Sequence, residues 1–126
     1  MEIKIAILGE DIDEINDIQT YLLNLDELEG EVFYALEDFR ESYSWGAGLN
    51  LLIIIIDSPH TNPVFSDEAL DFYLRNQNRF SCPILLITMD AEKNKQLRQE
   101  ERSIDFVECS FNVDLCFLAK VMERIL

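Results

Sequence analysis

The chain has 126 residues, which is the size of one globular domain. With 48% hydrophobic and 28% charged residues it can bury an ordinary core, which excludes disordered and collagen-like classes. It has 10 Lys and Arg against 25 Asp and Glu, a formal net charge of −15. A field this negative repels phosphate backbones and anionic lipids, so we expect neither nucleic acid nor a membrane as a partner.

The chain also lacks the signals of a membrane or exported protein. Its longest apolar stretch ends at Asp57, far short of the roughly 20 residues that a membrane-spanning helix needs. The first residues have no basic segment followed by a cleavage site, so we expect the protein in the cytoplasm. Cys82, Cys109 and Cys116 lack Cys-x-x-Cys spacing, and His60 is the single histidine, so we expect reduced thiols and no zinc site.

Strand and helix patterns alternate from the first residues onward. Apolar alternation over 3–8 predicts a strand. Apolar residues at steps of three and four over 11–25 then predict a helix that ends near Gly30. A short strand at 31–36, rich in β-branched and aromatic residues, and a short helix at 37–45 are expected next.

The second half of the chain continues this alternation. The apolar run 51–56 has no polar residue, so we expect a central strand that is buried on both faces. The elements expected after it are a helix capped by Ser66, a strand over 83–88, a helix over 91–103, a strand over 105–109 and a last helix that is capped by Asn112 and runs to Leu126. Five strands alternating with five helices predict an α/β fold. We expect one domain over residues 1–126, a doubly wound, five-stranded parallel sheet of the flavodoxin-like (βα)5 type with strand order 2-1-3-4-5.

Polar residues follow several of these strands. Glu10 and Asp11 come after the first strand, Asp57 follows the third and Thr88 ends the fourth. In the expected strand order, the crevice beyond the first and third strands is where ligands bind. Three carboxylates at one edge repel each other unless a hard cation lies between them, so we predict a Mg²⁺ site formed by Glu10, Asp11 and Asp57. For Asp11 the alternative is that it only caps the next helix.

Four segments along the whole chain carry a resemblance to a known family. They are Ile-Leu-Gly-Glu10-Asp11, Leu-Ile-Ile-Ile-Ile-Asp57, Pro-Ile-Leu-Leu-Ile-Thr88 and Asp-Phe106-Val-Glu-Cys109. Together they resemble the response-regulator receiver family. The resemblance implies that Glu10 and Asp11 hold Mg²⁺, that Asp57 accepts a phosphoryl group from a histidine kinase or phosphotransfer protein, and that Thr88 binds a phosphoryl oxygen. It also implies that Phe106 is an aromatic switch residue, for which the alternative is an ordinary core or edge aromatic.

The chain departs from the receiver pattern at two places. Receivers carry a lysine at the end of the last strand, where Cys109 and Ser110 stand here, and none of the four lysines ends a strand. Loss of a positioned cation weakens the stabilisation of a transferred phosphoryl group. In the loop after Asp57, Pro63 comes two residues later than the usual receiver proline, so we expect a longer loop, with His60 exposed to solvent.

Two surfaces are candidates for partner docking. The predicted helix 91–103 has four basic and three acidic residues, in contrast to the acidic remainder of the chain. This basic island is either a solvated helix face or a docking surface. The last helix has more apolar residues than one sheet-facing stripe needs. We therefore predict a homodimer or partner contact through the helix 91–103, the strand 105–109 and the last helix.

Three function classes remain open. The first is a stand-alone receiver-like module of a two-component or phosphorelay system, which has no output domain, is not an enzyme, and acts on downstream partners by protein contact. The second is a phosphorylation-independent pseudoreceiver, which the missing lysine at Cys109 favours. The third is a small Mg²⁺-dependent phosphatase with Asp57 as nucleophile. Such enzymes need a general acid two residues later, where Pro59 stands.

Overall fold

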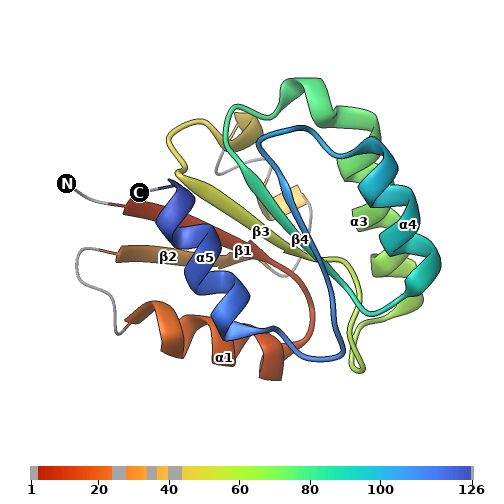
Figure 1. Cartoon of the computed structure of the whole chain (residues 1–126), viewed down its shortest axis with the longest axis horizontal. Coiled ribbons are helices and arrows are strands. Elements are labelled where there is room, and N and C mark those ends of the chain that lie inside the picture. The colour runs from red at the N-terminus through yellow and green to blue at the C-terminus, as the bar shows by residue number, and fades with distance from the viewer. Residues whose placement is uncertain (1–2, 24–27, 34–36, 40–43, 126) are drawn as a thin grey trace.

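The computed structural model describes residues 3–23, 28–33, 37–39 and 44–125, in which strands and helices alternate (Figure 1). The elements in chain order are β1 (Ile3–Leu8), α1 (Ile12–Leu23), β2 (Leu28–Phe33), β3 (Leu51–Ile55), α3 (Pro63–Asn76), β4 (Ile84–Thr88), α4 (Ala91–Glu100), β5 (Phe106–Cys109) and α5 (Leu115–Ile125). Short 3-10 helices, Ser44–Gly46 and Gln77–Arg79, precede β3 and β4. Every helix in these residues is too short or too polar to span a bilayer.

The strands run parallel to one another. β3 lies between β1 and β4, and β5 pairs with the other edge of β4. β2 runs parallel to β1. Helices α1 and α5 cover one face of the sheet, and α3 and α4 cover the opposite face (Figure 1). The predicted α/β class, with an all-parallel sheet and helices between strands, is therefore confirmed.

Strand β3 lies at the centre of two hydrophobic clusters. Leu52, Ile54 and Ile56 belong to the cluster under α3 and α4, whereas the alternate residues Leu51 and Ile53 belong to the cluster under α1 and α5. All of these side chains are buried. The prediction that this run is buried on both faces is confirmed. Its cause is that successive side chains of a strand point to opposite faces, and helices cover both.

Helix α3 begins four residues earlier than predicted, because its cap is Asn62 and not Ser66. The side chain of Asn62 caps it by accepting the N–H of Val64 at 2.8 Å, and Pro63 occupies the first helical position. Proline suits this position because its missing N–H has no partner there in any helix. Ser66, the predicted cap, is instead a buried residue within the helix. From this position in the first turns of α3, the Ser66 hydroxyl faces Asp57.

Other element bounds differ by a few residues. Helix α5 starts after Asp114, whose carboxylate accepts the N–H of Cys116 at 2.9 Å, and not at Asn112. Helix α4 ends at Glu100, before the predicted end at 103. The described part of α1 reaches Leu23, and residues 24–25 of the predicted helix lie outside the described residues. β2 begins at Leu28, three residues before the start of the predicted strand 31–36. Residues 34–36 of that predicted strand lie outside the described residues.

The predicted helix over 37–45 is only partly within the described residues. Residues 37–39 are helical, and residues 40–43 lie outside the described part of the chain. Phe39 is buried and contacts Phe72 of α3 edge to face, with ring centroids 6.4 Å apart. The ring of Trp45 stacks on Phe72 at 5.8 Å, as expected for a packing residue.

An ionic network joins α3 to the loop between α4 and β5, next to the amino end of β4. The Arg102 guanidinium donates to both carboxylate oxygens of Asp105 at 2.8 Å and to the carbonyls of Phe80 and Cys82 at 2.7 and 2.8 Å. The Tyr73 hydroxyl donates to the same carboxylate at 2.7 Å. Asp105 is buried, so its charge depends on these donors. Arg102 therefore lies in the loop between α4 and β5 and stabilises that loop, and it is not part of α4, although the predicted helix 91–103 includes it.

Candidate functional site

The ends of β3 and β4 bring Asp57 and Thr88 together. Residues 55 and 87 are partners in the parallel pairing of β3 and β4, so the residues that follow them in the two strands lie at the same edge of the sheet. The Thr88 hydroxyl donates to Asp57 Oδ1 at 2.8 Å, and the backbone N–H of Met89 donates to the same oxygen at 2.6 Å. Both side chains are buried, Asp57 with 7% of its surface exposed.

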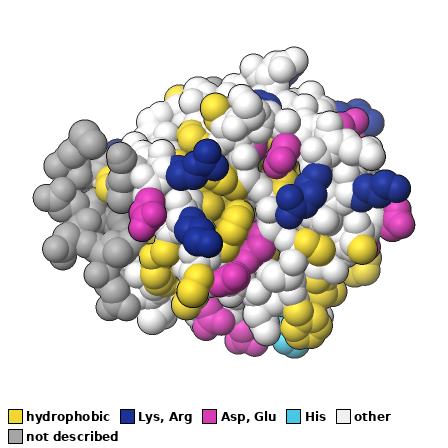
Figure 2. Space-filling model, in the orientation of Figure 1, with side chains coloured by type: hydrophobic (Ala, Val, Ile, Leu, Met, Phe, Trp, Pro, Cys, Tyr) yellow, Lys and Arg dark blue, Asp and Glu magenta, His cyan; other side chains and the backbone are white. Residues whose placement is uncertain are grey.

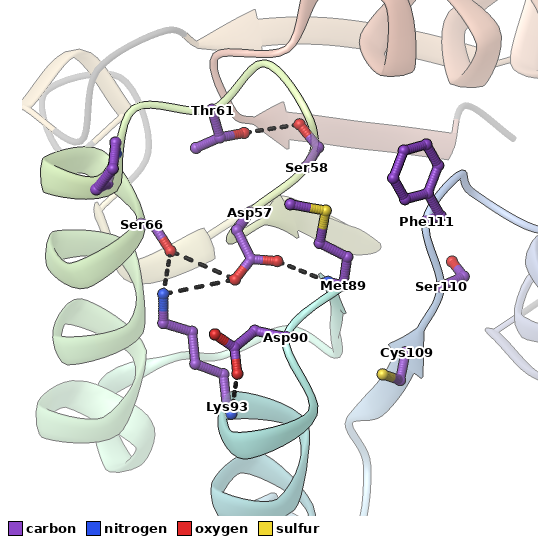
Figure 3. A pocket seen from close by; sticks show the side chains of 11 residues that line it. Asp57, Ser58, Thr61, Ser66, Met89, Asp90, Lys93, Cys109, Ser110 and Phe111 are labelled. Carbon is purple, nitrogen blue, oxygen red and sulfur yellow. Dashed lines mark hydrogen bonds and ion pairs between the residues drawn. The ribbon is translucent and has the colours of Figure 1, made fainter.

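The second oxygen of Asp57 has looser contacts. Oδ2 lies 3.5 Å from the Ser66 hydroxyl and 3.5 Å from the Lys93 ammonium (Figure 3). Lys93 in turn donates to Ser66 Oγ at 2.6 Å. Oδ1 is therefore held by two short hydrogen bonds, whereas Oδ2 is the less engaged oxygen and lies beside a positive charge.

A cavity of about 590 Å³ opens beside Asp57. Its wall is formed by the loops that follow β3, β4 and β5 and by the first turns of α3 and α4 (Figure 3). Hydroxyl groups line it from Ser58, Thr61 and Ser66, and Lys93 supplies positive charge. Two carboxylates, Asp57 and Asp90, also line the cavity, and Lys93 is the cation among its lining residues.

Asp11 caps α1 and accepts a hydrogen bond from Ser58. Its Oδ1 accepts the N–H groups of Asp13 and Glu14 at 3.1 and 3.2 Å, and its Oδ2 accepts the Ser58 hydroxyl. Burial raises the pKa of Asp11, but the hydrogen bonds from Ser58 and from the Glu14 backbone outweigh it, so the pKa lies below its ordinary value. The alternative interpretation of Asp11, as a helix cap, is what the structure contains.

Glu10 also has a protein partner, the N–H of Asn62, which donates to its Oε1 at 3.0 Å. The three carboxylates predicted to bind Mg²⁺, Glu10, Asp11 and Asp57, are therefore directed to separate donors. Among the described residues, no group of three or more His, Cys, Asp or Glu side chains is placed to hold a metal ion. The three carboxylates do not form a preformed Mg²⁺ site in this arrangement, and Mg²⁺ binding stays a prediction.

Cys109 lies opposite Thr88 in the pairing of β4 and β5 and lines the cavity. Cys109 is a free, exposed cysteine. Because a thiol carries no positive charge, this residue places no cation at the end of β5. The cation comes instead from Lys93 on the first turn of α4, a residue that the sequence analysis did not select. The sequence signal for Lys93 is its place in the first turn of the helix after β4. That turn starts at the same edge of the sheet as Asp57.

Phe106 lies at the opposite end of β5, paired with Leu85. It packs with the cluster under α1 and α5, and the Arg124 guanidinium lies 5.7 Å from its ring centroid. These are packing contacts, and the role of Phe106 as a switch residue stays a prediction. His60 is exposed, as predicted, with its Nε2 3.8 Å from Asp13 Oδ2.

A second group of carboxylates holds the loop between β5 and α5. Glu108 accepts the N–H of Asp114 at 2.8 Å, and Glu14 accepts the N–H of Val113 at 2.9 Å. Glu108 is buried, and its Oε2 has no hydrogen-bond partner among the described residues. Burial, and then the negative charges of Asp114 and Glu14, raise the pKa of Glu108 to about 7.

The basic residues predicted to form an island around α4 are largely used within the protein. Lys93 contacts Asp57, Arg102 binds Asp105, and Arg98 donates to the Val107 carbonyl at 3.3 Å. Figure 2 shows Lys and Arg side chains dispersed among acidic and hydrophobic ones on the visible face, without one continuous basic patch.

The apolar excess of α5 is also mostly buried. Leu118, Val121 and Met122 are buried, and Phe117 and Ile125 are partly buried against the same cluster. Leu115 is the large apolar residue of α5 that is exposed. The exposed apolar strip expected on this helix is therefore short.

Comparison with known proteins gives no further assignment. No protein-family model matches the chain, and a search of curated proteins finds no match.

Proposed function

We propose that the protein is a receiver-like signal-transduction module of a two-component or phosphorelay system, in which Asp57 accepts a phosphoryl group and the output passes by protein contact. The proposal includes a complete flavodoxin-like sheet of five strands in the order 2-1-3-4-5. The pairing of β2 with β1 and of β3 with both β1 and β4 supports this order. The donor of the phosphoryl group would be a histidine kinase or phosphotransfer protein.

One observation carries the proposal. Asp57 sits at the carboxyl end of a buried central strand, hydrogen-bonded to Thr88 on the neighbouring strand and beside Lys93, at the wall of a cavity. In parallel α/β sheets, ligands bind at this edge. Phosphoryl transfer requires an in-line oxygen nucleophile and positive charge near the equatorial oxygens. Asp57 and Lys93 supply these two requirements.

The less engaged oxygen of Asp57, Oδ2, would be the nucleophile. It attacks the phosphorus of a phosphohistidine or acyl phosphate, an O–P bond forms, and the bond from phosphorus to the leaving group breaks with its electron pair. The hydroxyl of Ser66 and the ammonium of Lys93 lie next to Oδ2 and would meet the new phosphoryl oxygens. Oδ1 stays bound to Thr88 and to the N–H of Met89, which keeps the carboxylate oriented.

The test is incubation with acetyl phosphate followed by intact-protein mass spectrometry. The wild-type protein is expected to gain one phosphoryl group, and Asp57→Asn none. Asp17→Asn, an exposed residue of α1, is the matched control and should be modified like the wild type. Modification of Asp57→Asn to the wild-type extent would contradict Asp57 as the acceptor.

A second candidate function is a pseudoreceiver that docks its partner without phosphorylation. It is favoured by the separate partners of Glu10, Asp11 and Asp57 and by the uncharged end of β5 at Cys109. An unmodified wild-type protein in the acetyl phosphate experiment would favour this candidate. We do not propose the phosphatase, because Pro59 has no proton to donate as a general acid.

The partner surface belongs to the same proposal. We propose that α4, β5 and α5 form the docking face for a downstream protein or a second copy of the chain. Exposed apolar side chains at both ends of this face, Ile104 before β5 and Leu115 at the start of α5, support it. Sedimentation tests the second copy, since a strictly monomeric protein would leave only the downstream partner.

A further inference from the structure

Lys93 has a fixed backbone and a side chain that points into the candidate site. It belongs to the first turn of α4, where the Asp90 side chain caps the helix by accepting the N–H groups of Glu92 and Lys93 at 2.8 and 3.2 Å. The Lys93 side chain is 20% exposed, which is low for a lysine on a helix that is otherwise mostly exposed. A long side chain ordered in this way needs partners that offset its lost conformational freedom.

Three oxygen atoms surround the Lys93 ammonium. They belong to Ser66 at 2.6 Å, Asp57 at 3.5 Å and Asp67 at 3.7 Å. Ser66 and Asp67 lie on α3, Asp57 follows β3, and Lys93 itself lies on α4. One ammonium therefore links two helices to the carboxylate at the centre of the site, as the dashed contacts of Figure 3 show.

The charge balance favours the contact between Lys93 and Asp57, although the two groups are 3.5 Å apart. Asp57 is 7% exposed, and within the described residues Lys93 is the one cation within 4 Å of it. A buried carboxylate without a nearby positive charge is costly, and its attraction to a partner is screened little by salt. Asp67, in contrast, has a 79% exposed side chain, so its attraction for Lys93 is weakened by solvent.

We infer that Lys93 transmits the charge state of Asp57 to α4, so that a change at the carboxylate moves or loosens the first turn of that helix. The phosphoryl part of this inference rests on the proposed function. A phosphoryl group on Oδ2 would add negative oxygens beside the ammonium, and Lys93 would leave Ser66 to follow them. By thermodynamic reciprocity, a partner that binds the first turn of α4 changes how readily Asp57 accepts the group.

The first experiment measures phosphorylation of Lys93 variants with acetyl phosphate. Lys93→Met removes the charge and keeps the side-chain length, and it is expected to slow modification roughly tenfold or more. Lys95→Met, an exposed residue of the same helix, is the control and should react like the wild type. Lys93→Arg keeps the charge and should restore most of the rate. A Lys93→Met protein as reactive as Lys95→Met would overturn the inference and leave Asp57 as the acceptor.

The second experiment does not depend on phosphorylation. Amide hydrogen exchange in the first turn of α4 is compared between wild type and Asp57→Asn, in the native protein and in the Lys93→Met background. We expect Asp57→Asn to accelerate exchange in this turn roughly fivefold, as loss of about 1 kcal/mol would. In the Lys93→Met background the effect should disappear.

These two measurements separate the two claims. If the wild type is not phosphorylated, the proposed function fails, and the exchange comparison alone decides the role of Lys93. Equal exchange in wild type and Asp57→Asn, or an equal acceleration with and without Lys93, would overturn it. Should Lys93→Met fold poorly by circular dichroism, Lys93→Gln provides a polar neutral variant for the same comparison.

Discussion

Thr88 donates a 2.8 Å hydrogen bond to Asp57, and this bond joins the carboxyl ends of two neighbouring buried strands. The Thr88 side chain is fully buried, and the pairing of residues 55 and 87 sets the distance between the two strand ends. A hydroxyl placed in this way holds the carboxylate in one orientation, which leaves Oδ2 toward Lys93 and the cavity.

Thr88→Val tests this bond. The change keeps the shape and removes the donor, so we expect the free energy of unfolding to fall by about 1–2 kcal/mol in urea denaturation. The loss has this size because Asp57 Oδ1 keeps the N–H of Met89 as a second donor. Ser103→Ala, an exposed change, should have an effect within about 0.5 kcal/mol. Equal stability of Thr88→Val and wild type would mean that the bond is absent in solution.

The ion pair of Lys93 and Asp57 is tested by a double-mutant cycle. Lys93→Met, Asp57→Asn and the double variant are compared in urea denaturation, and we expect a coupling free energy of about 1 kcal/mol. It exceeds that of exposed pairs because both side chains are mostly covered, with 20% and 9% exposed. A coupling free energy near zero would show that the two groups are independent in solution.

Glu108 predicts a pH dependence of stability. Its pKa is raised to about 7 in the folded protein from an ordinary value of 4.5, so the folded state binds its proton more tightly than the unfolded state. This contribution to stability is fully present below about pH 4.5 and is lost as the pH rises through about 7. Glu108→Gln removes the ionisation and keeps an acceptor for the N–H of Asp114.

Glu108→Gln should therefore be more stable than the wild type at pH 8, by on the order of 2 kcal/mol, and nearly equal to it at pH 4.5. The measurement is thermal or urea unfolding of both proteins across this pH range. Glu100→Gln, an exposed change on α4, should show no such divergence. A constant difference between Glu108→Gln and wild type at all pH values would contradict the assignment.

Arg102 is expected to contribute more to stability than an exposed arginine. Arg102→Met would take the cation away from the buried Asp105 carboxylate, which keeps the Tyr73 hydroxyl as a neutral donor, and would remove a donor from two backbone carbonyls. We therefore expect a loss of about 3–5 kcal/mol in urea denaturation. Arg75→Met removes an exposed pair with Asp71 and should cost at most about 1 kcal/mol. Similar losses for the two variants would contradict the importance of the buried network.

The sequence predicted the strand ends better than the side-chain directions there. The apolar runs that end at Asp57 and Thr88 are unambiguous, and parallel pairing brings such ends together whatever the details of the loops. The position of Asp11 after the first strand does not reveal which donors its carboxylate meets, so the sequence leaves both a metal site and a helix cap open. In the structure, two backbone N–H groups of α1 donate to one oxygen of Asp11, and the Ser58 hydroxyl donates to the other.

Lys93 and the start of α3 were missed for a related reason. A lysine reaches its partner through a long flexible side chain, so its contact with Asp57 depends on where α4 starts in three dimensions. Asn62 and Ser66 are both good helix caps. Pro63, which favours the first helical position, is the sequence signal that distinguishes them.

The most direct test of the central claim is an NMR titration with beryllofluoride, a mimic of a phosphoryl group, in the presence and absence of Mg²⁺. If Asp57 is a phosphoryl acceptor coupled to α4 through Lys93, the amide resonances of Thr88, Met89 and the first turn of α4 will shift together, and Asp57→Asn will abolish the shifts. If millimolar beryllofluoride shifts none of them under either condition, the site does not accept a phosphoryl group and the account is contradicted.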